Sequence, residues 1–210
     1  MSTAYAQCSL VGYIGAFNNE TGAFIGAVAR ALGSQGIFTL DTTGVSANYL
    51  GVIGITNDTN TGTAVLLQII SPVDANVPFV GIVAGFNNVT CFGSQPIPSE
   101  SGWAAQIIPT DGSPRGPFPE PGDTKSTLLG DYGTLSVFCG EPMAFTIRSN
   151  LGMNTLIPIW TDQFGIQHTL IFLHDTTNNR LSVSPSLASY AAIAHGPVPQ
   201  TQEVVIAIFT

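Results

Sequence analysis

Residues 11–32 read Val11-Gly-Tyr-Ile-Gly-Ala-Phe17, Asn18-Asn-Glu-Thr-Gly22 and Ala23-Phe-Ile-Gly-Ala-Val-Ala-Arg-Ala-Leu32. Two apolar runs therefore flank a short polar turn that ends in glycine. Asn and Gly adopt turn backbone angles that other residues avoid, and such a turn between apolar runs is typical of a β-hairpin. The stretch predicts two antiparallel strands and sets the expectation for the rest of the chain.

A helix over 21–32, ended by Gly33, is the alternative for the second apolar run. Phe24, Val28 and Leu32 recur at helical spacing, and alanine is frequent. A helix over 21–32 would contain two interior glycines, Gly22 and Gly26, each of which costs a helix about 1 kcal/mol relative to alanine. This glycine content and the matching strand before the turn favour the hairpin.

The same pattern returns later in the chain. Residues 50–55 and 63–70 flank the turn Thr56-Asn-Asp-Thr-Asn-Thr-Gly62, and residues 80–86 lead into Asn87-Asn-Val-Thr90. Two origins are open, a degenerate internal repeat or the turn chemistry that any β-protein needs. We favour turn chemistry, because Asn and Gly are the residues that tight turns select.

Residues 94–133 differ in composition. Their centre is Gly112-Ser-Pro-Arg-Gly-Pro-Phe-Pro-Glu-Pro-Gly122. Proline at this frequency removes ladder donors and forbids a helix. We predict a Pro/Gly-rich connection over about 94–133, which crosses between sheets or lies over a binding mouth.

The C-terminal third returns to strand patterns, at 135–139, 143–147, 154–160, 166–174, 181–184 and 203–209. We expect the strands from Trp160 to Ser184 to form an antiparallel meander and the apolar run 203–209 to be a central strand. One helix is predicted over about 185–195, with Ser184 as its N-cap and Pro185 at its first position.

These patterns predict an all-β fold in one domain, residues 1–210. The specific expectation is an antiparallel β-sandwich with one short helix near the C-terminus, because many short strands separated by turns are typical of that architecture.

The charge balance limits the partners. The chain has 5 basic and 13 acidic residues in 210, and a net charge of −8. Such a chain cannot neutralise a phosphate backbone, so we expect no nucleic-acid partner and no anionic membrane partner. The apolar runs are too short to span a bilayer as helices. The N-terminus has no signal-peptide pattern, which predicts a cytoplasmic or non-classically secreted protein.

The three cysteines, Cys8, Cys91 and Cys139, are widely spaced and exclude a cysteine-rich zinc site. A disulfide between Cys91 and Cys139 and three buried thiols are both open. The sequons at Asn19, Asn57 and Asn88 fit either glycosylation or turn chemistry, and without a signal peptide we favour turn chemistry.

Catalytic and metal motifs are sparse. His168 and His174 fall on one predicted strand, six residues apart, which is about 20 Å and too far to share one ion. His195 could join them only through folding. His174 and Asp175 could belong to a hydrolytic triad, but neighbouring strand residues face opposite sides. Asp58-Thr-Asn-Thr-Gly62 lacks the later carboxylates of a calcium loop. We predict a protein that is not an enzyme and holds no metal.

Aromatic residues are the best candidates for a binding site. The chain has 12 Phe, 5 Tyr and 2 Trp, some of which could line a cavity for a planar ligand. We select Trp103, Phe118, Tyr132 and Trp160 as candidate ligand-binding residues, because aromatic residues elsewhere on core strands more often only fill space.

The opening hairpin Gly12–Val28 resembles a group of small proteins from mushroom-forming fungi. Their N-termini read roughly Gly-Tyr-Ile, a turn, Thr-Gly-x-Phe and Gly-x-Val. Trp160-Thr-Asp-Gln-Phe-Gly165 and Leu170-Ile-Phe-Leu-His-Asp175 are similar to their C-terminal hairpin. One association of this group is with the pink chromoprotein of oyster mushrooms. The resemblance implies a β-scaffold that holds an apolar organic pigment, and it transfers no site residue.

We therefore expect a non-catalytic protein that binds an apolar or aromatic small molecule, with an organic chromophore as one candidate. The alternative is a lectin that binds glycans through its Asn- and Thr-rich turns. A storage or surface protein without a ligand, and self-association into a homo-oligomer, are also open.

Overall fold

The structure is a computed structural model. It describes residues 8–33, 36–56, 64–75, 77–84, 104–110, 120–121, 139–141, 145–150, 153–161, 166–193 and 200–210.

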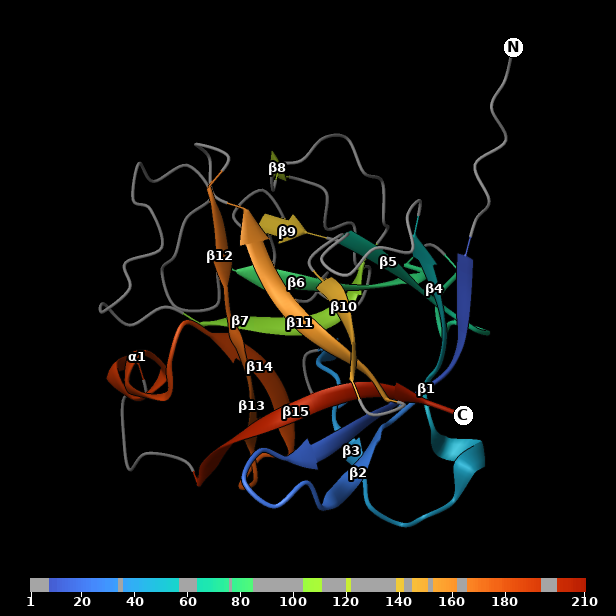
Figure 1. Cartoon of the computed structure of the whole chain (residues 1–210), viewed down its shortest axis with the longest axis horizontal. Coiled ribbons are helices and arrows are strands. Elements are labelled where there is room, and N and C mark those ends of the chain that lie inside the picture. The colour runs from blue at the N-terminus through green and yellow to red at the C-terminus, as the bar shows by residue number, and fades with distance from the viewer. Residues whose placement is uncertain are drawn as a thin grey trace.

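Eight antiparallel strands form a closed barrel (Figure 1). In order around the barrel they are β1 (Cys8–Asn18), β4 (Gly51–Thr56), β5 (Ala64–Ile69), β6 (Phe79–Ala84), β7 (Ala105–Thr110), β14 (Arg180–Ser184), β13 (Ile171–Asp175) and β15 (Thr201–Phe209). The barrel closes where β15 pairs with β1, so its first and last strands lie side by side.

The other elements extend this barrel. They are β2 (Phe24–Val28), β3 (Leu40–Asp41), the 3₁₀ helix η2 (Ser46–Asn48), β8 (Glu120–Pro121), β9 (Cys139–Glu141), β10 (Phe145–Asn150), β11 (Met153–Thr161), β12 (Gln167–Thr169) and α1 (Leu187–Ile193). The β10–β11 hairpin joins β5 to β15 at one end, where β6 and β13 pair with other parts of those two strands. No helix within the described ranges is both long enough and apolar enough to cross a membrane.

The predicted β-sandwich is wrong. A sandwich has two sheets whose outer strands are edges, whereas here the strand pairings run from β1 around to β15 and back to β1. Sandwich and barrel strands share the same alternation of apolar and polar residues. The difference depends on pairings between distant segments, such as Gln68 with Phe79 and Ser182 with Gln106.

Several predicted elements are confirmed. The opening stretch is the β1–β2 hairpin, and no part of residues 21–32 is helical. The run 50–55 pairs with 63–70 as β4 and β5, and 203–209 lies in β15, which has paired strands on both edges. The helix predicted over 185–195 is present as α1.

Other boundaries differ from the prediction. Residues 105–110, inside the predicted connection, form β7 in the barrel wall. The single strand expected over 166–174 breaks at Leu170, so that β12 pairs with β11 while β13 pairs with β14 and β15. The N-cap of α1 is Ser186 and not Ser184, because the Ser186 Oγ accepts a hydrogen bond from the Ser189 backbone N–H at 3.0 Å.

Alternate residues of the barrel strands point inward and form one core. It includes Ile14 and Ala16 from β1, Val52 from β4, Val65 and Leu67 from β5, Val80 and Ile82 from β6, Ile107 from β7, Leu181 and Val183 from β14, Phe172 from β13, and Val204, Ile206 and Ile208 from β15. Eight strands enclose a space that side chains can fill completely.

Glycine at position 12 allows the end of β15 to cross β1. A Cβ atom at Gly12 would lie 2.3 Å from the backbone oxygen of Phe209, which a small side-chain movement cannot relieve. At Gly54, on the neighbouring strand, a Cβ would meet Val65 at an ordinary 3.5 Å.

We therefore predict that Gly12→Ala lowers the free energy of unfolding by about 1–3 kcal/mol, the usual cost of overpacking. Gly54→Ala is the control and should change it by less than about 1 kcal/mol, because the space exists and alanine is the better strand residue. Urea unfolding of both variants measures the difference. Equal effects would show that the crossing at Gly12 is not as tight as described.

Candidate functional site

Only one of the four aromatic residues selected from the sequence is described by the structure, so the site that they were predicted to form stays a prediction. Trp160 is 6% exposed and belongs to the hydrophobic core. Trp103, Phe118 and Tyr132 lie outside the described residues. Three other places in the structure are candidate sites. They are a pocket at one mouth of the barrel, the outer face of β1 and β15, and the buried His174 on β13.

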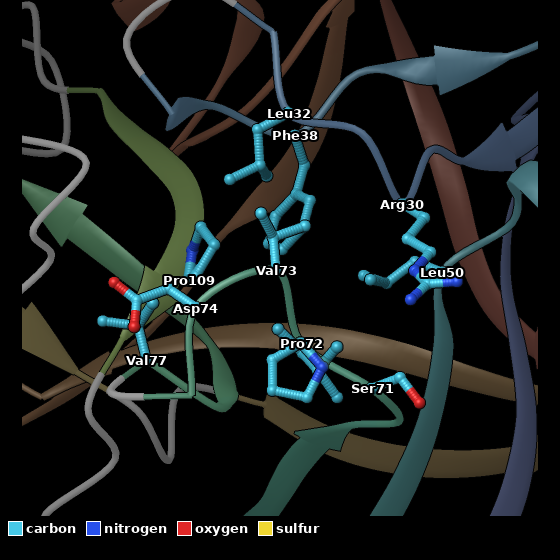
Figure 2. Close-up of a pocket in the computed structure, with 11 residues that line it drawn as sticks. Arg30, Leu32, Phe38, Leu50, Ser71, Pro72, Val73, Asp74, Val77 and Pro109 are labelled. Atoms are coloured by element: carbon cyan, nitrogen blue, oxygen red, sulfur yellow. The ribbon is translucent and has the colours of Figure 1, made fainter.

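A pocket lies at one mouth of the barrel, where β4 begins and β5 ends (Figure 2). We call it the mouth pocket. It is lined by Arg30, Leu32, Phe38, Leu50, Ile69, Ser71, Pro72, Val73, Asp74, Val77 and Pro109. Most of these side chains are apolar, as is usual for small-molecule sites. The enclosed free space is only about 10 Å³, so the pocket is shallow in this conformation.

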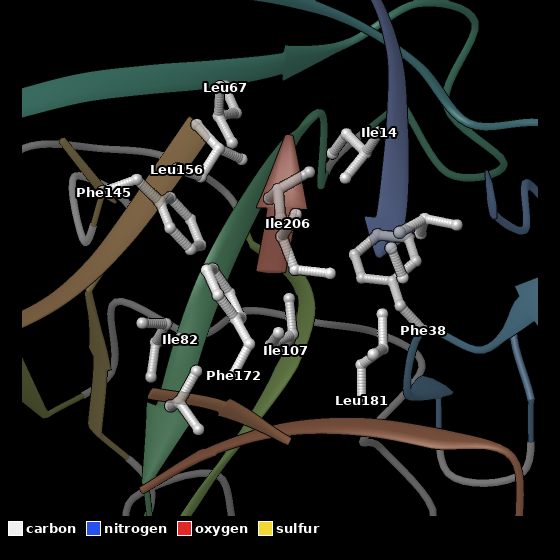
Figure 3. Close-up of a cluster of buried hydrophobic side chains, with 14 of the residues drawn as sticks. Ile14, Phe38, Leu67, Ile82, Ile107, Phe145, Leu156, Phe172, Leu181 and Ile206 are labelled. Atoms are coloured by element: carbon white, nitrogen blue, oxygen red, sulfur yellow. The ribbon is translucent and has the colours of Figure 1, made fainter. Parts of the chain in front are cut away.

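A second void lies inside the barrel (Figure 3). Its free volume is about 20 Å³, close to the space that one water molecule needs. Phe145 and Phe172 both line this void, and their stacked rings have centroids 6.1 Å apart. Ile206 and Leu181 also line it. Ligand pockets typically measure about 300–1,000 Å³, so the described interior is packed rather than hollow.

Phe38 lines both the mouth pocket and the interior void. Its backbone is held between two barrel strands, because the Phe38 N–H donates to Ile107 O and Phe38 O accepts from the Leu181 N–H, each at 3.1 Å. The side chain is 1% exposed. Phe38 therefore adjoins both spaces while its backbone is anchored to β7 and β14.

Two charged side chains border the mouth pocket. In Figure 2 Arg30 and Asp74 lie on opposite sides of it, with Val73 between them. Arg30 is exposed and Asp74 is half-buried. The arginine is notable because the chain has few basic residues, and its guanidinium can bind a carboxylate or sulfonate in two-point fashion.

Five aromatic rings form a cluster on the outer face of β1, β2 and β15. We call it the outer aromatic cluster, and its members are Tyr13, Phe17, Phe24, Tyr49 and Phe209. Neighbouring ring centroids are 5.4–6.3 Å apart, and most pairs are edge-to-face. None of these residues belongs to the core, and Phe24 is 49% exposed.

A glycine on β1 makes room for one ring of the cluster. A Cβ at Gly15 would lie 2.8 Å from the Phe209 ring, so this ring packs directly against the backbone of β1. The sequence analysis missed the cluster, although a signal existed. Val11, Tyr13, Gly15 and Phe17 alternate with the inward residues, and the hairpin places Phe24 opposite Phe17.

His174 is buried at an end of β13 and has structural partners. Its Nε2 lies 3.0 Å from Asn179 Oδ1, and the Gln202 amide donates to its Nδ1 at 3.4 Å. Asn179 also donates to Leu40 O, which links the β13–β14 turn to β3. The Asp175 carboxylate instead accepts hydrogen bonds within the turn, from the backbone N–H groups of residues 177 and 178 and from the Asn178 amide.

Metal ligands do not gather in the described part of the chain, where no group of three or more His, Cys, Asp or Glu residues could hold an ion. His168 is half-buried on β12, opposite Trp160, and His195 lies outside the described residues. The side chains of the three cysteines, and the sequons at Asn57 and Asn88, also lie outside what is described, so those expectations stay predictions.

Comparisons with protein families, curated proteins and solved structures return no match for this chain. Its function must therefore be argued from the three places just described.

The histidine network generates a stability prediction. Asn179→Gly keeps the left-handed backbone at φ 51° but removes both side-chain hydrogen bonds. We expect the free energy of unfolding to fall by about 1–3 kcal/mol, because His174 and Leu40 O lose partners in a buried place. Asn178→Ala removes one part-buried hydrogen bond from an exposed side chain and should cost no more than about 1 kcal/mol, because the Asp175 carboxylate keeps two backbone donors. Urea unfolding of both variants tests this, and an Asn179→Gly protein as stable as the parent would contradict it.

Proposed function

We propose that this protein binds a small apolar or aromatic molecule without chemical conversion, and that the ligand enters through the mouth pocket. The observation that carries the proposal is the position of Phe38, which lines both an apolar surface pocket and an apolar interior void. Both spaces are too small for a ligand as they stand. Binding therefore requires the Phe38 ring to move, and the ligand replaces its contacts with the core.

The chemistry of the pocket supports a ligand with an apolar body and one acidic or polar group. The body would contact Leu50, Val73 and Val77, which line the pocket. The acidic group would lie against Arg30, at the exposed rim. A few polar groups around an apolar pocket usually set the orientation of a ligand.

One further observation favours binding over catalysis, and one suggests a pigment as the ligand. The buried His174 and Asp175 are engaged in separate structural hydrogen bonds, so neither orients the other for nucleophilic chemistry. The resemblance of residues 12–28 to mushroom proteins associated with a pink chromoprotein makes an organic chromophore a natural first ligand to look for.

The direct test is the mass and absorption of protein purified from its natural source. Intact mass under native and denaturing conditions should differ by one small molecule, or show a covalent adduct, and a pigment would add a visible absorption band. Native protein with the mass of the bare chain and no ligand after exhaustive screening would contradict the proposal.

The location of the site can be tested with an anionic aromatic dye, 1-anilinonaphthalene-8-sulfonate. We expect dye fluorescence to increase on binding and Val73→Asp to weaken the dye affinity at least about 10-fold, because it places a carboxylate in the apolar pocket. Val73 is 66% exposed, so this variant should still fold. Val45→Asp is the matched control, since Val45 is 51% exposed and does not line the pocket. Equal losses in both variants would place the dye elsewhere.

The role of Phe38 gives a second prediction. Phe38→Ala should lower the free energy of unfolding by about 3–5 kcal/mol, as loss of a buried phenylalanine does. It should also join the mouth pocket to the interior and strengthen dye binding. Urea unfolding and dye titration measure the two effects. A destabilised variant with unchanged dye affinity would show that Phe38 only fills the core.

A further inference from the structure

The outer aromatic cluster is a second candidate binding surface, separate from the mouth pocket. Its rings come from β1, β2, β15 and the residue that follows η2, and they form one connected group. Phe24 is 49% exposed, and Val11 on the same face of β1 is 51% exposed. The group therefore offers apolar surface to solvent on a face that no described element covers.

The cluster is preorganised. The Phe24 ring packs edge to face against the rings of Phe17 and Phe209, with centroid separations of 5.4 and 5.8 Å. Phe209 in turn rests on the backbone at Gly15. Rings fixed in this way lose little conformational freedom when a ligand stacks on them, which favours binding.

Hydrogen-bonding groups lie at the hairpin end of the cluster. Asn18 Oδ1 accepts from the backbone N–H groups of Glu20 and Thr21 at 3.0 and 2.8 Å, which fixes the turn. The exposed Asn19 amide then donates to Glu203 Oε1 at 3.1 Å. In the β1–β15 ladder Phe17 is paired with Val205. Asn19 and Glu203 each lie two residues beyond this pair, so the Asn19–Glu203 pair lies next to Phe17 on the same face of the sheet. It presents further oxygen acceptors next to the rings.

The charge of this surface selects a neutral ligand. The charged side chains at the hairpin end are carboxylates, Glu20 and Glu203, which disfavour an anion. They also disfavour a second copy of the chain, because two such faces would bring like charges together at a net charge of −8 each. The Asn19 amide occupies Glu203 Oε1, which leaves Oε2 as an acceptor for a hydroxyl donor, and the test below separates a neutral donor from a cation.

We propose that the outer aromatic cluster binds a neutral carbohydrate. A sugar ring has an apolar C–H face and a rim of hydroxyl groups, and this surface has the same two parts. The C–H face would stack on Phe24 and Phe209, and hydroxyl groups would donate to Asn19 and Glu203. The site shares no residue with the mouth pocket, so failure of one proposal does not decide the other.

The test is titration of the intact protein with neutral sugars, followed by NMR and calorimetry. The probes are the methyl glycosides of glucose, galactose and N-acetylglucosamine, and chitobiose. A shallow site with one stacking surface should give dissociation constants of about 1 mM or somewhat below. Chemical-shift changes should be confined to the hairpin, β15 and residue 49.

Variants locate the site. Phe24→Ala should weaken sugar binding at least about 10-fold, comparable to the loss of one stacked ring, while Phe24→Trp should retain binding. Ile166→Ala is the matched control, since Ile166 is 56% exposed and lies outside the cluster. Glu203→Gln keeps an oxygen acceptor but removes the charge, and should change the sugar affinity less than about 3-fold.

Three results would overturn the proposal. The first is that none of the four sugars binds at a sugar concentration 10-fold above the expected dissociation constant of about 1 mM. The second is equal binding by Phe24→Ala and the parent, with both folded by circular dichroism. The third is preferential binding of a quaternary ammonium such as choline, lost in Glu203→Gln, which would assign the rings to a cation instead.

Discussion

The pairing of β15 with β1 is the constraint on which the rest of the structure depends. Six residue pairs, from Tyr13 with Phe209 to Asn18 with Val204, join the two ends of the chain into one wall. Gly12 permits the close approach of the Phe209 backbone to β1, and Gly15 leaves room for the Phe209 ring. Without this pairing β1 and β15 would expose unpaired edges along this stretch, and an open sheet edge invites pairing with other chains.

Closure also determines where function can lie. A ring of eight strands has an interior that side chains just fill, and here Phe145, Phe172 and their neighbours leave about 20 Å³. A ligand must therefore displace a side chain at a mouth or bind on the outer surface. Phe38 is the side chain best placed to be displaced, because its ring borders both spaces while its backbone is fixed to β7 and β14.

Local structure could be predicted from the sequence where local chemistry decides it. The β1–β2 hairpin follows from Asn18 and its turn, and α1 from a serine cap and apolar spacing, although the cap is Ser186. Barrel closure could not be predicted, because it depends on pairings such as Gln68 with Phe79 that no local pattern encodes. The candidate sites also divide into one that local sequence could indicate and one that depends on the fold. Alternation along β1 could have indicated the aromatic face, whereas the mouth pocket combines residues 30, 38, 73 and 109, and only the fold brings them together.

The two proposed binding surfaces share a segment of backbone. Tyr49 belongs to the outer aromatic cluster, and the next residue, Leu50, lines the mouth pocket and is 2% exposed. This segment is held by two backbone hydrogen bonds, from the Leu50 N–H to Val28 O at 2.8 Å and from the Arg30 N–H to Asn48 O at 2.7 Å. A ligand that shifts Leu50 as it enters past Phe38 would therefore strain these bonds. Through Val28 the strain would reach β2, which also carries Phe24.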